Sequence, residues 1–545
     1  MTVVIIVKTT SNRMGWPCSP GPGRRHPPLL PSDAMTPARR PGPAGRTVGA
    51  GLLVSLAVAA AACGTSGSSG TSTRSTPPTT SAALPAPAPP PPITWTTCPT
   101  HADVQCGTVP VPLDYAHPTA GTIVLAVSRI PAGGGTAASG TLVVNPGGPG
   151  ESGNQILPIE YPLLPAVVRS SVDVVSFDPR GTGASSPLRC GTSLAGVTSA
   201  LPAPARAGQP LPGTPVFAGI PPACAAAAPA LTPRVDTVDT ARDLDRIRQA
   251  LGDGSISFYG LSYGTVLGTA YASLFPHRVR TMVLDGAVDL YAPLARQAAE
   301  QAPAAERALA HLLATCGSGP ACPLGPDPAA FYDRLQASIT AHPLPAPGHG
   351  DTTPVTLGDL DTASLFAVSV PGFTPLYESA LVDAAHGDGA ALRSLALEFV
   401  VDVDGAPLVD AQWAIACNDT AGHPGPTAAG TLARTLGTRY PRVGAFAVNY
   451  TLGGCIAWPG ARQPVAGLHP ASAPPVLVIG NTGDPNTPLV GARNLARAFP
   501  RATQLTWVGW GHTWLLSGAT DTCMQAAVGR YLTTGALPAP RAVCR

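Results

Sequence analysis

The chain has 545 residues, which is enough for one large domain or two domains of ordinary size. Its formal net charge is only +2 and 12% of its residues are charged, so the composition argues against a nucleic-acid-binding surface. The hydrophobic fraction of 44% is typical of a globular protein.

The first part of the chain predicts export. Three basic residues, Arg39, Arg40 and Arg46, precede an apolar run at 48–62 that ends at Cys63. A positive segment, a short apolar run and small residues before a break are typical of a secretory signal, and the run is short for a membrane span. The ending resembles a bacterial lipoprotein signal, in which Cys63 would be lipidated and become the first residue. An ordinary secretion signal is the alternative.

These features divide the N-terminal region into three parts. Met35 is a natural start for the signal, so we expect 1–34 to be a leader that is absent from the mature protein and 35–63 to be the signal peptide. Residues 64–94 are rich in Ser, Thr, Ala, Gly and Pro, cannot bury a core, and should act as a tether. We therefore expect a lipoprotein on the outer face of the cytoplasmic membrane, held there by its lipid alone, or a secreted protein.

Ten cysteines remain when Cys18 and Cys63 are set aside, an even number that fits an exported chain. Their spacing suggests five local bridges between sequence neighbours, although sequence alone does not fix the connectivity. The ten are Cys98, Cys106, Cys190, Cys224, Cys316, Cys322, Cys417, Cys455, Cys523 and Cys544. A metal site is the competing interpretation, but no C-x-x-C pair or histidine-rich cluster supports it, so we expect no metal and no cofactor.

Strand and helix patterns alternate in the segment 95–290. Strands are predicted at 122–130, 141–145, 172–178, 255–259 and 279–284, with helices at 235–251 and 265–274. Alternation of this kind predicts a mostly parallel sheet with helical crossovers. The expected fold class is therefore α/β, with helices flanking the sheet.

The strand pattern disappears after residue 290 and returns near the C-terminus. Residues 291–410 are rich in Ala and Leu with helical texture, and strands are predicted again at 475–480 and 503–509. We therefore expect a hydrolase-type core in two parts, 95–290 and 411–545, with 291–410 inserted as a helical cap. A separate C-terminal helical domain is the alternative, and the return of strands argues against it.

The stretch Gly260-Leu-Ser-Tyr-Gly264 predicts a nucleophile elbow. It matches G-x-S-x-G and lies between a predicted strand and a predicted helix. Such a turn is so sharp that only small neighbours fit beside the serine, which explains the two glycines. The five-residue pattern alone is weak, so Ser262 as nucleophile needs further support.

That support comes from an acid and a base in the required chain order. Hydrolases built on this elbow carry Ser, then Asp or Glu, then His. Asp484 follows the predicted strand at 475–480, at the carboxyl end of the sheet, and His512 follows the next strand. His512 is the last histidine of the chain and the only one after Asp484. A loop cap and a turn residue are the alternative roles for Asp484 and His512.

A Gly-rich loop at 146–150 predicts part of an oxyanion hole. Backbone N–H groups must face the developing negative charge, one from Tyr263 and one from a loop after an early strand. The loop follows the predicted strand at 141–145, so Gly147 and Gly148 are the candidates. A phosphate site is disfavoured because no Lys-Ser or Lys-Thr follows.

Five motifs taken together carry a specific resemblance. They are Asn145-Pro-Gly-Gly-Pro-Gly150, Phe177-Asp-Pro-Arg-Gly-Thr-Gly183, Gly260-Leu-Ser-Tyr-Gly264, Ala416-Cys-Asn-Asp419 and Asp484-Pro-Asn-Thr-Pro488. The chain resembles the tripeptidyl aminopeptidase branch of the α/β-hydrolases, which are exported actinobacterial serine exopeptidases related to prolyl aminopeptidases. The resemblance covers residues 95–545 and implies a cap and a TAP-like C-terminal segment from about residue 430. Pro146 stands where prolyl aminopeptidases usually have His, which favours the tripeptidyl branch.

An aminopeptidase must bind a protonated amine, which calls for a carboxylate near the cleft. Asp419 is the first candidate, and Glu300 and Glu398 in the expected cap are weaker ones. The alternative is that Asp419 merely caps a helix or turn. Glu151, directly after the Gly-rich loop, is expected to point outward, with a substrate cation as the other option.

Three functions remain open. The first is a peptidase that removes short peptides from free N-termini, with peptide as its partner and no nucleic acid. The second is an esterase or lipase, because ester and amide cleavage share the triad. The third is a catalytically silent binding lipoprotein, which an intact triad argues against. A serine at the elbow disfavours a dehalogenase or epoxide hydrolase, and the oligomeric state is open.

Overall fold

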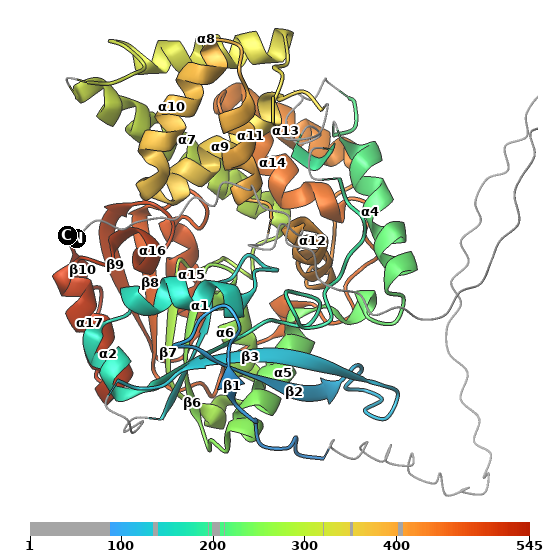
Figure 1. Ribbon diagram of the computed structural model, residues 1–545, viewed down its shortest axis with the longest axis vertical. Helices are drawn as coiled ribbons and strands as arrows, with labels where there is room; N and C mark the ends of the chain where they lie inside the picture. The colour runs from blue at the N-terminus through green and yellow to red at the C-terminus, as the bar shows by residue number, and fades with distance from the viewer. Residues whose placement is uncertain are drawn as a thin grey trace, which may run out of the picture. The chain divides into compact units, whose positions relative to one another are not determined.

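The computed structural model describes residues 88–545, apart from 134–139, 194–195, 199–207, 212, 320, 349–352 and 402–406. The predicted leader, signal peptide and lipidated Cys63 lie outside these residues and remain predictions, as does most of the tether. Within the described residues, one sheet of ten strands has the order β1-β2-β3-β5-β4-β6-β7-β8-β9-β10 (Figure 1). The strands are β1 Thr96–Thr97, β2 Gln105–Pro112, β3 Thr122–Ile130, β4 Thr141–Asn145, β5 Asp173–Phe177, β6 Ile256–Leu261, β7 Val279–Asp285, β8 Val476–Gly483, β9 Ala502–Trp510 and β10 Val543–Cys544.

The strands from β5 to β10 in this order pair in parallel, which confirms the predicted fold class. Every residue of β4 and β6 is buried, as expected for parallel strands covered by helices on both faces. The antiparallel part, β1 to β3 with β5, was not predicted in full. Pro110 and Pro112 hide β2 in the sequence, and they are tolerated because β1 pairs only with Cys106 and Gln105.

Helices cover both faces of the sheet. One hydrophobic core contains side chains of α5, α6 and α15, and a second contains side chains of α1, α2, α16 and α17. These helices are α1 Gly153–Glu160, α2 Ala166–Ser171, α5 Thr237–Leu251, α6 Gly264–Leu274, α15 Leu489–Ala498, α16 Trp514–Gly518 and α17 Thr522–Thr534. The side chain of Asp236 caps α5 by accepting from Asp239 N at 2.8 Å, and Gly252 ends this helix at φ +78°. The sheet with its two helical layers presents the carboxyl ends of its parallel strands along one edge.

A run of helices separates β7 from β8 in the chain and gathers on one side of the sheet (Figure 1). They are α7 Leu294–Ser318, α8 Pro328–Ala341, α9 Leu357–Ser369, α10 Thr374–Ala385, α11 Ala390–Glu398, α12 Leu408–Asn418, α13 Pro426–Arg439 and α14 Gly444–Leu452. The helices continue past residue 410 because α12, α13 and α14 pack with α7 and α4 (Thr214–Ala227) in the same hydrophobic core. The helical region therefore continues through α14, past residue 410, where the cap was expected to end.

Hydropathy gives a limited result on membrane spans. Among the described residues no single helix is long and apolar enough to cross a membrane. The helical segments Leu357–Ser369 and Pro371–Ala385 reach the length and hydropathy of a membrane span only when they are taken together, and the chain bends by 117° between them.

The predicted disulfide pattern is confirmed, since each bridge joins neighbouring cysteines in the sequence. The bridges are Cys98–Cys106, Cys190–Cys224, Cys316–Cys322, Cys417–Cys455 and Cys523–Cys544. Asp521 lies near the last of these bridges in a group with metal-ligand geometry, but both of its cysteines are used in the disulfide. These disulfides covalently link loops and helix ends, both in the core and in the helical region.

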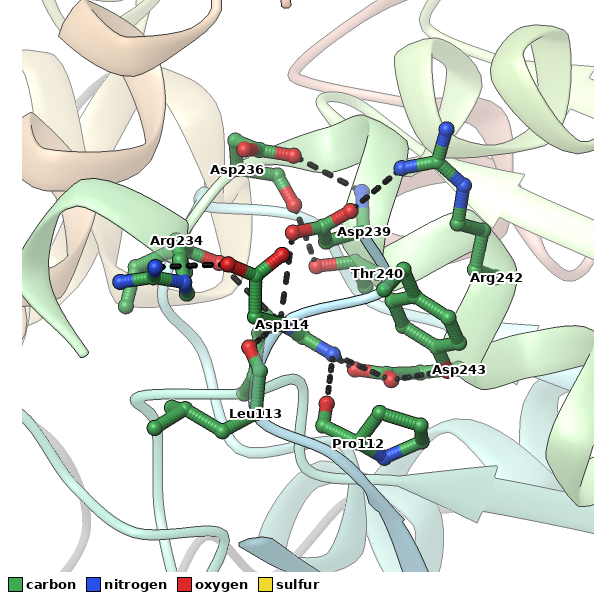
Figure 2. A network of polar contacts seen from close by, with 12 residues as sticks. Pro112, Leu113, Asp114, Arg234, Asp236, Asp239, Thr240, Arg242 and Asp243 are labelled. Atoms are coloured by element: carbon green, nitrogen blue, oxygen red, sulfur yellow. Dashed lines mark hydrogen bonds and ion pairs between the residues drawn. The ribbon is translucent and has the colours of Figure 1, made fainter. Parts of the chain in front are cut away.

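A buried arginine ties the loop after β5 to helix α5. Arg180 is fully buried, and its Nε and Nη2 donate to the two carboxylate oxygens of Asp243 at 2.7 and 2.6 Å. Nη2 also donates to the carbonyl of Pro112, and Nη1 to that of Leu113, both at 3.2 Å. Figure 2 labels Pro112, Leu113 and Asp243 in this network of polar contacts. A bidentate pair with further backbone acceptors satisfies most of the guanidinium donors, which a buried charge requires. Arg180 in the motif at 177–183 thus links the antiparallel edge, α5 and the loop that follows β5.

We predict that Arg180→Met lowers the free energy of unfolding by about 3–5 kcal/mol, because it leaves Asp243 as a buried charge without its partner. Denaturant unfolding followed by circular dichroism measures this change. Arg296→Ala is the control, because Arg296 pairs with Glu300 on the surface and should leave the unfolding midpoint unchanged. Equal midpoints for Arg180→Met and the unaltered protein would contradict the role given to Arg180.

Candidate active site

Ser262 stands on a tight turn between β6 and α6. Its φ is +54°, in the left-handed region that a non-glycine residue adopts rarely. A Cβ at Gly260 would lie 2.2 Å from the Gly264 carbonyl oxygen, and one at Gly264 would lie 2.6 Å from the Asn145 oxygen. Only glycine fits at both places, so the two glycines of the motif are required by close backbone approach. The turn holds the serine at the carboxyl end of the sheet.

His512 and Asp484 are brought together by the loops after β9 and β8. Nδ1 of His512 lies 2.9 Å from Oδ1 of Asp484 and 3.1 Å from Oδ2. Asp484 also accepts from Thr487 N at 2.8 Å and from Thr513 N at 3.2 Å, so its carboxylate is fixed by backbone donors. Because Asp484 occupies Nδ1, Nε2 is the ring nitrogen left to take a proton from a nucleophile.

The Gly-rich loop lies against the nucleophile. Gly147 and Gly148 have φ of +106° and +99°, and a Cβ at Gly147 would lie 3.1 Å from both Ser262 Cβ and Tyr263 N. The absence of side chains at these positions lets the loop backbone approach the amide of Tyr263. The structure therefore places the predicted oxyanion-hole residues beside one another, and their N–H groups as donors remain a prediction.

A cavity of about 500 Å³ opens between the sheet edge and the helical region. Ser262, Tyr263 and His512 line it from the core, while Gln301, Trp413 and Tyr450 line it from the helices. A serine, a histidine with a carboxylate partner and a Gly-rich loop on one cavity wall can carry out acyl transfer.

Asp419 also lines the cavity, at the end of α12, but it is 4% exposed and already engaged. Oδ1 accepts from Thr237 N at 2.8 Å and Oδ2 accepts from Thr237 Oγ1 at 2.6 Å. The Thr237 hydroxyl in turn contacts the Tyr263 hydroxyl. Burial and the nearby Asp236 raise the pKa of Asp419 to about 8. Asp419 thus connects α12, the start of α5 and the residue after the nucleophile, and amine binding by it remains a prediction.

The other predicted carboxylates are placed differently from expectation. Glu300 pairs with Arg296 at 2.8 Å, one turn along α7, and Glu398 is exposed at the end of α11; neither lines the cavity. Glu151 was expected to point outward, yet it lines the cavity, because the loop that brings Gly147 to Ser262 also brings Glu151 there.

Asp285, at the end of β7, is a site residue that the sequence analysis missed. Its backbone oxygen accepts from Ser262 N at 2.8 Å. Its carboxylate accepts from Trp514 N and Leu515 N, directly after His512 and Thr513, and from the Tyr259 hydroxyl, each at 3.0 Å. Burial is the main cause that raises the pKa of Asp285 to about 6. Its place directly after a predicted strand, at the edge that carries Asp484, could have drawn attention to it.

The pKa of His512 is set by opposing effects. Burial lowers it, whereas the negative charges of Asp484, Asp285 and Glu151 and the hydrogen bond that Nδ1 donates to Asp484 raise it by more, so the pKa lies above its ordinary value near 6.5. Only the neutral imidazole can accept a proton from Ser262.

We therefore predict that kcat/KM for a nitrophenyl ester rises with pH through a pKa above 6.5, as His512 loses its proton. The measurement is a steady-state profile from pH 5 to 9. A profile that is flat between about pH 5 and 8 would contradict His512 as general base.

A second prediction concerns Asp285→Asn. An amide presents N–H groups toward backbone donors that need an acceptor, so the His512 loop should shift. Misplacement of a catalytic group by about 1 Å can cost about 100-fold, and we expect a loss of this size in kcat with little change in KM. Tyr259→Phe is the control, because it keeps both backbone contacts of Asp285. A wild-type kcat for folded Asp285→Asn would show that Asp285 does not position the histidine.

Comparison with known proteins agrees with this geometry. A family model described as alpha/beta hydrolase fold matches residues 140–366, and one described as TAP-like protein matches residues 440–544. Serine protease Hip1 of Mycobacterium tuberculosis is 32% identical over 489 residues, which cover 83% of this chain and 91% of the relative. Carboxylesterase B of the same organism is 33% identical over 80% of this chain and 85% of its own length. Tripeptidyl aminopeptidase of Streptomyces coelicolor is 29% identical over 81% and 83%.

The fold, the elbow and the two family models agree along most of the described chain. Relatives above 30% identity cover more than two thirds of it. The chain is a serine hydrolase that belongs to the TAP-like branch of the α/β-hydrolase family.

Proposed function

We propose that the chain is a serine exopeptidase that removes short peptides from free N-termini, in the manner of tripeptidyl and prolyl aminopeptidases. The observation that carries the proposal is the charge of the cavity. Its described lining residues include no lysine or arginine and two acidic residues, Glu151 and Asp419. Glu151 contributes the negative charge at neutral pH, because the pKa of Asp419 is raised to about 8. A cavity of this kind favours a substrate that brings a positive charge, as the free amine of a peptide does.

The proposed mechanism passes through an acyl-enzyme. Ser262 Oγ attacks the scissile carbonyl while His512 Nε2 takes the hydroxyl proton. The N–H groups of Tyr263 and of the loop at Gly147 and Gly148 stabilise the tetrahedral oxyanion. His512 then gives its proton to the leaving amine, and a water molecule repeats the sequence on the ester to release the peptide. Asp484 keeps the imidazole oriented and stabilises its charged form.

Two relatives favour peptide cleavage, the protease Hip1 and the tripeptidyl aminopeptidase. The alternative is an esterase, which is favoured by the 33% identity to carboxylesterase B and by the chemistry that both reactions share. Export with a lipid on Cys63 belongs to the same proposal. A mass spectrum of the mature N-terminus without a lipid mass, or starting elsewhere, would exclude lipidation.

A panel of substrates tests the function. We predict that the protein cleaves a free tripeptide anilide and that acetylation of its N-terminus lowers kcat/KM about ten- to a hundredfold, because a charged hydrogen bond is lost. Ser262→Ala should abolish cleavage while the circular dichroism spectrum stays unchanged. Equal rates on the free and blocked peptides would reject the exopeptidase. Cleavage of a nitrophenyl ester without cleavage of any peptide would favour the esterase.

A further inference from the structure

Glu151 occupies a position in the cavity that neither the triad nor the oxyanion hole uses. It directly follows the loop at Gly147 and Gly148, and its Cγ lies 3.3 Å from where a Cβ of Gly148 would be. A Cβ at Gly147 would in turn lie 3.1 Å from Ser262 Cβ. The Glu151 side chain is half-buried and lines the same cavity as Ser262. The chain therefore puts an acidic residue in the wall of the cavity that contains the nucleophile, next to the Gly-rich loop.

The charge of Glu151 acts across the cavity. It contributes to the raised pKa of His512 on the core side and of Tyr450 on α14. The fully buried Glu160 is a further acidic group within the electrostatic reach of Glu151. A negative charge near a developing oxyanion raises the barrier for a neutral substrate, because the two charges repel. A cation on the substrate would offset that repulsion.

The two acidic residues of the cavity are connected to the reacting centre in different ways. Asp419 is connected to the Tyr263 amide only through the length of the Tyr263 side chain and the Thr237 hydroxyl. Glu151 is two residues from Pro149 and adjacent to the oxyanion loop itself. Because Glu151 adjoins this loop and each further residue of an extended peptide lies about 3.3–3.6 Å farther along, we infer that the group paired with Glu151 belongs to the residue whose carbonyl is attacked.

We propose that Glu151 is a specificity-determining residue that pairs with a cationic group on the residue that acylates Ser262. The proposal rests on the proposed acyl-enzyme chemistry at Ser262 and deepens it by naming the substrate class. The cation has two possible sources: the α-ammonium, when that residue is the N-terminal one, or the side chain of lysine or arginine, when further residues precede it. Both are ammonium or guanidinium groups that a carboxylate binds by charged hydrogen bonds.

Amino-acid nitrophenyl esters separate the two sources. They need only the triad, so the test holds whether the protein prefers peptides or esters. The panel contains free alanine ester, N-acetyl-alanine ester and N-acetyl-lysine ester. Glu151→Gln keeps the shape of the side chain and removes its charge. We expect it to lower kcat/KM about ten- to a hundredfold on the cationic substrate that Glu151 binds and to leave or raise the rate on neutral N-acetyl-alanine ester.

The pattern of losses identifies the source. A loss on free alanine ester alone assigns the α-amine, and a loss on N-acetyl-lysine ester alone assigns a basic side chain. Asp333→Asn is the control, because Asp333 lies exposed on α8 and pairs with Arg442 outside the cavity. Asp419→Asn, assayed on the same panel, tests whether the second acidic residue of the cavity contributes to cation binding. Equal losses on all three esters, or no loss on either cationic ester, would overturn the proposal. Failure of the unaltered protein to cleave peptide anilides would reject the exopeptidase while leaving this result intact.

Discussion

The buried carboxylate of Asp285 is the constraint on which the site depends. Its backbone holds the amide of Ser262, and its side chain holds the two amides that follow the His512 loop. One residue at the end of β7 thus fixes the positions of both the nucleophile and the base, which come from distant parts of the chain. Because the carboxylate is fully buried, these two amides and the Tyr259 hydroxyl compensate its desolvation, so the His512 loop cannot move without a cost in free energy.

Acidic groups also explain the electrostatics of the cavity. Asp484 orients His512, while Asp285 and Glu151 add to the field that raises the imidazole pKa. A positive imidazole forms when Ser262 loses its proton, and this field stabilises it. The same field is unfavourable to the oxyanion, and this is the reason for proposing that a substrate cation binds in the cavity. Asp419 joins α12 to the core through Thr237.

Local sequence patterns were sufficient to predict several strands, the disulfide pairing and the candidate triad. The strands at 122–130 and 141–145 have the expected bounds, and the disulfides between sequence neighbours followed from the spacing of the cysteines. The elbow, Asp484 and His512 could be found because chain order and strand ends restrict the choice. The positions of Glu151, Glu300 and Glu398 could not, because they depend on how a loop or helix turns in three dimensions. Asp285 was missed for a related reason, since its partners are backbone amides about 230 residues away, which leave no pattern in the sequence.

The central claim is that Ser262 is a nucleophile activated by His512. Labelling with a fluorophosphonate tests it most directly, because this reagent bonds covalently to activated serines. Peptide mass spectrometry should find one phosphonylated site, Ser262, and His512→Ala should lower the labelling rate by orders of magnitude while the protein stays folded. Labelling at another serine, or an unchanged rate in His512→Ala, would contradict the account.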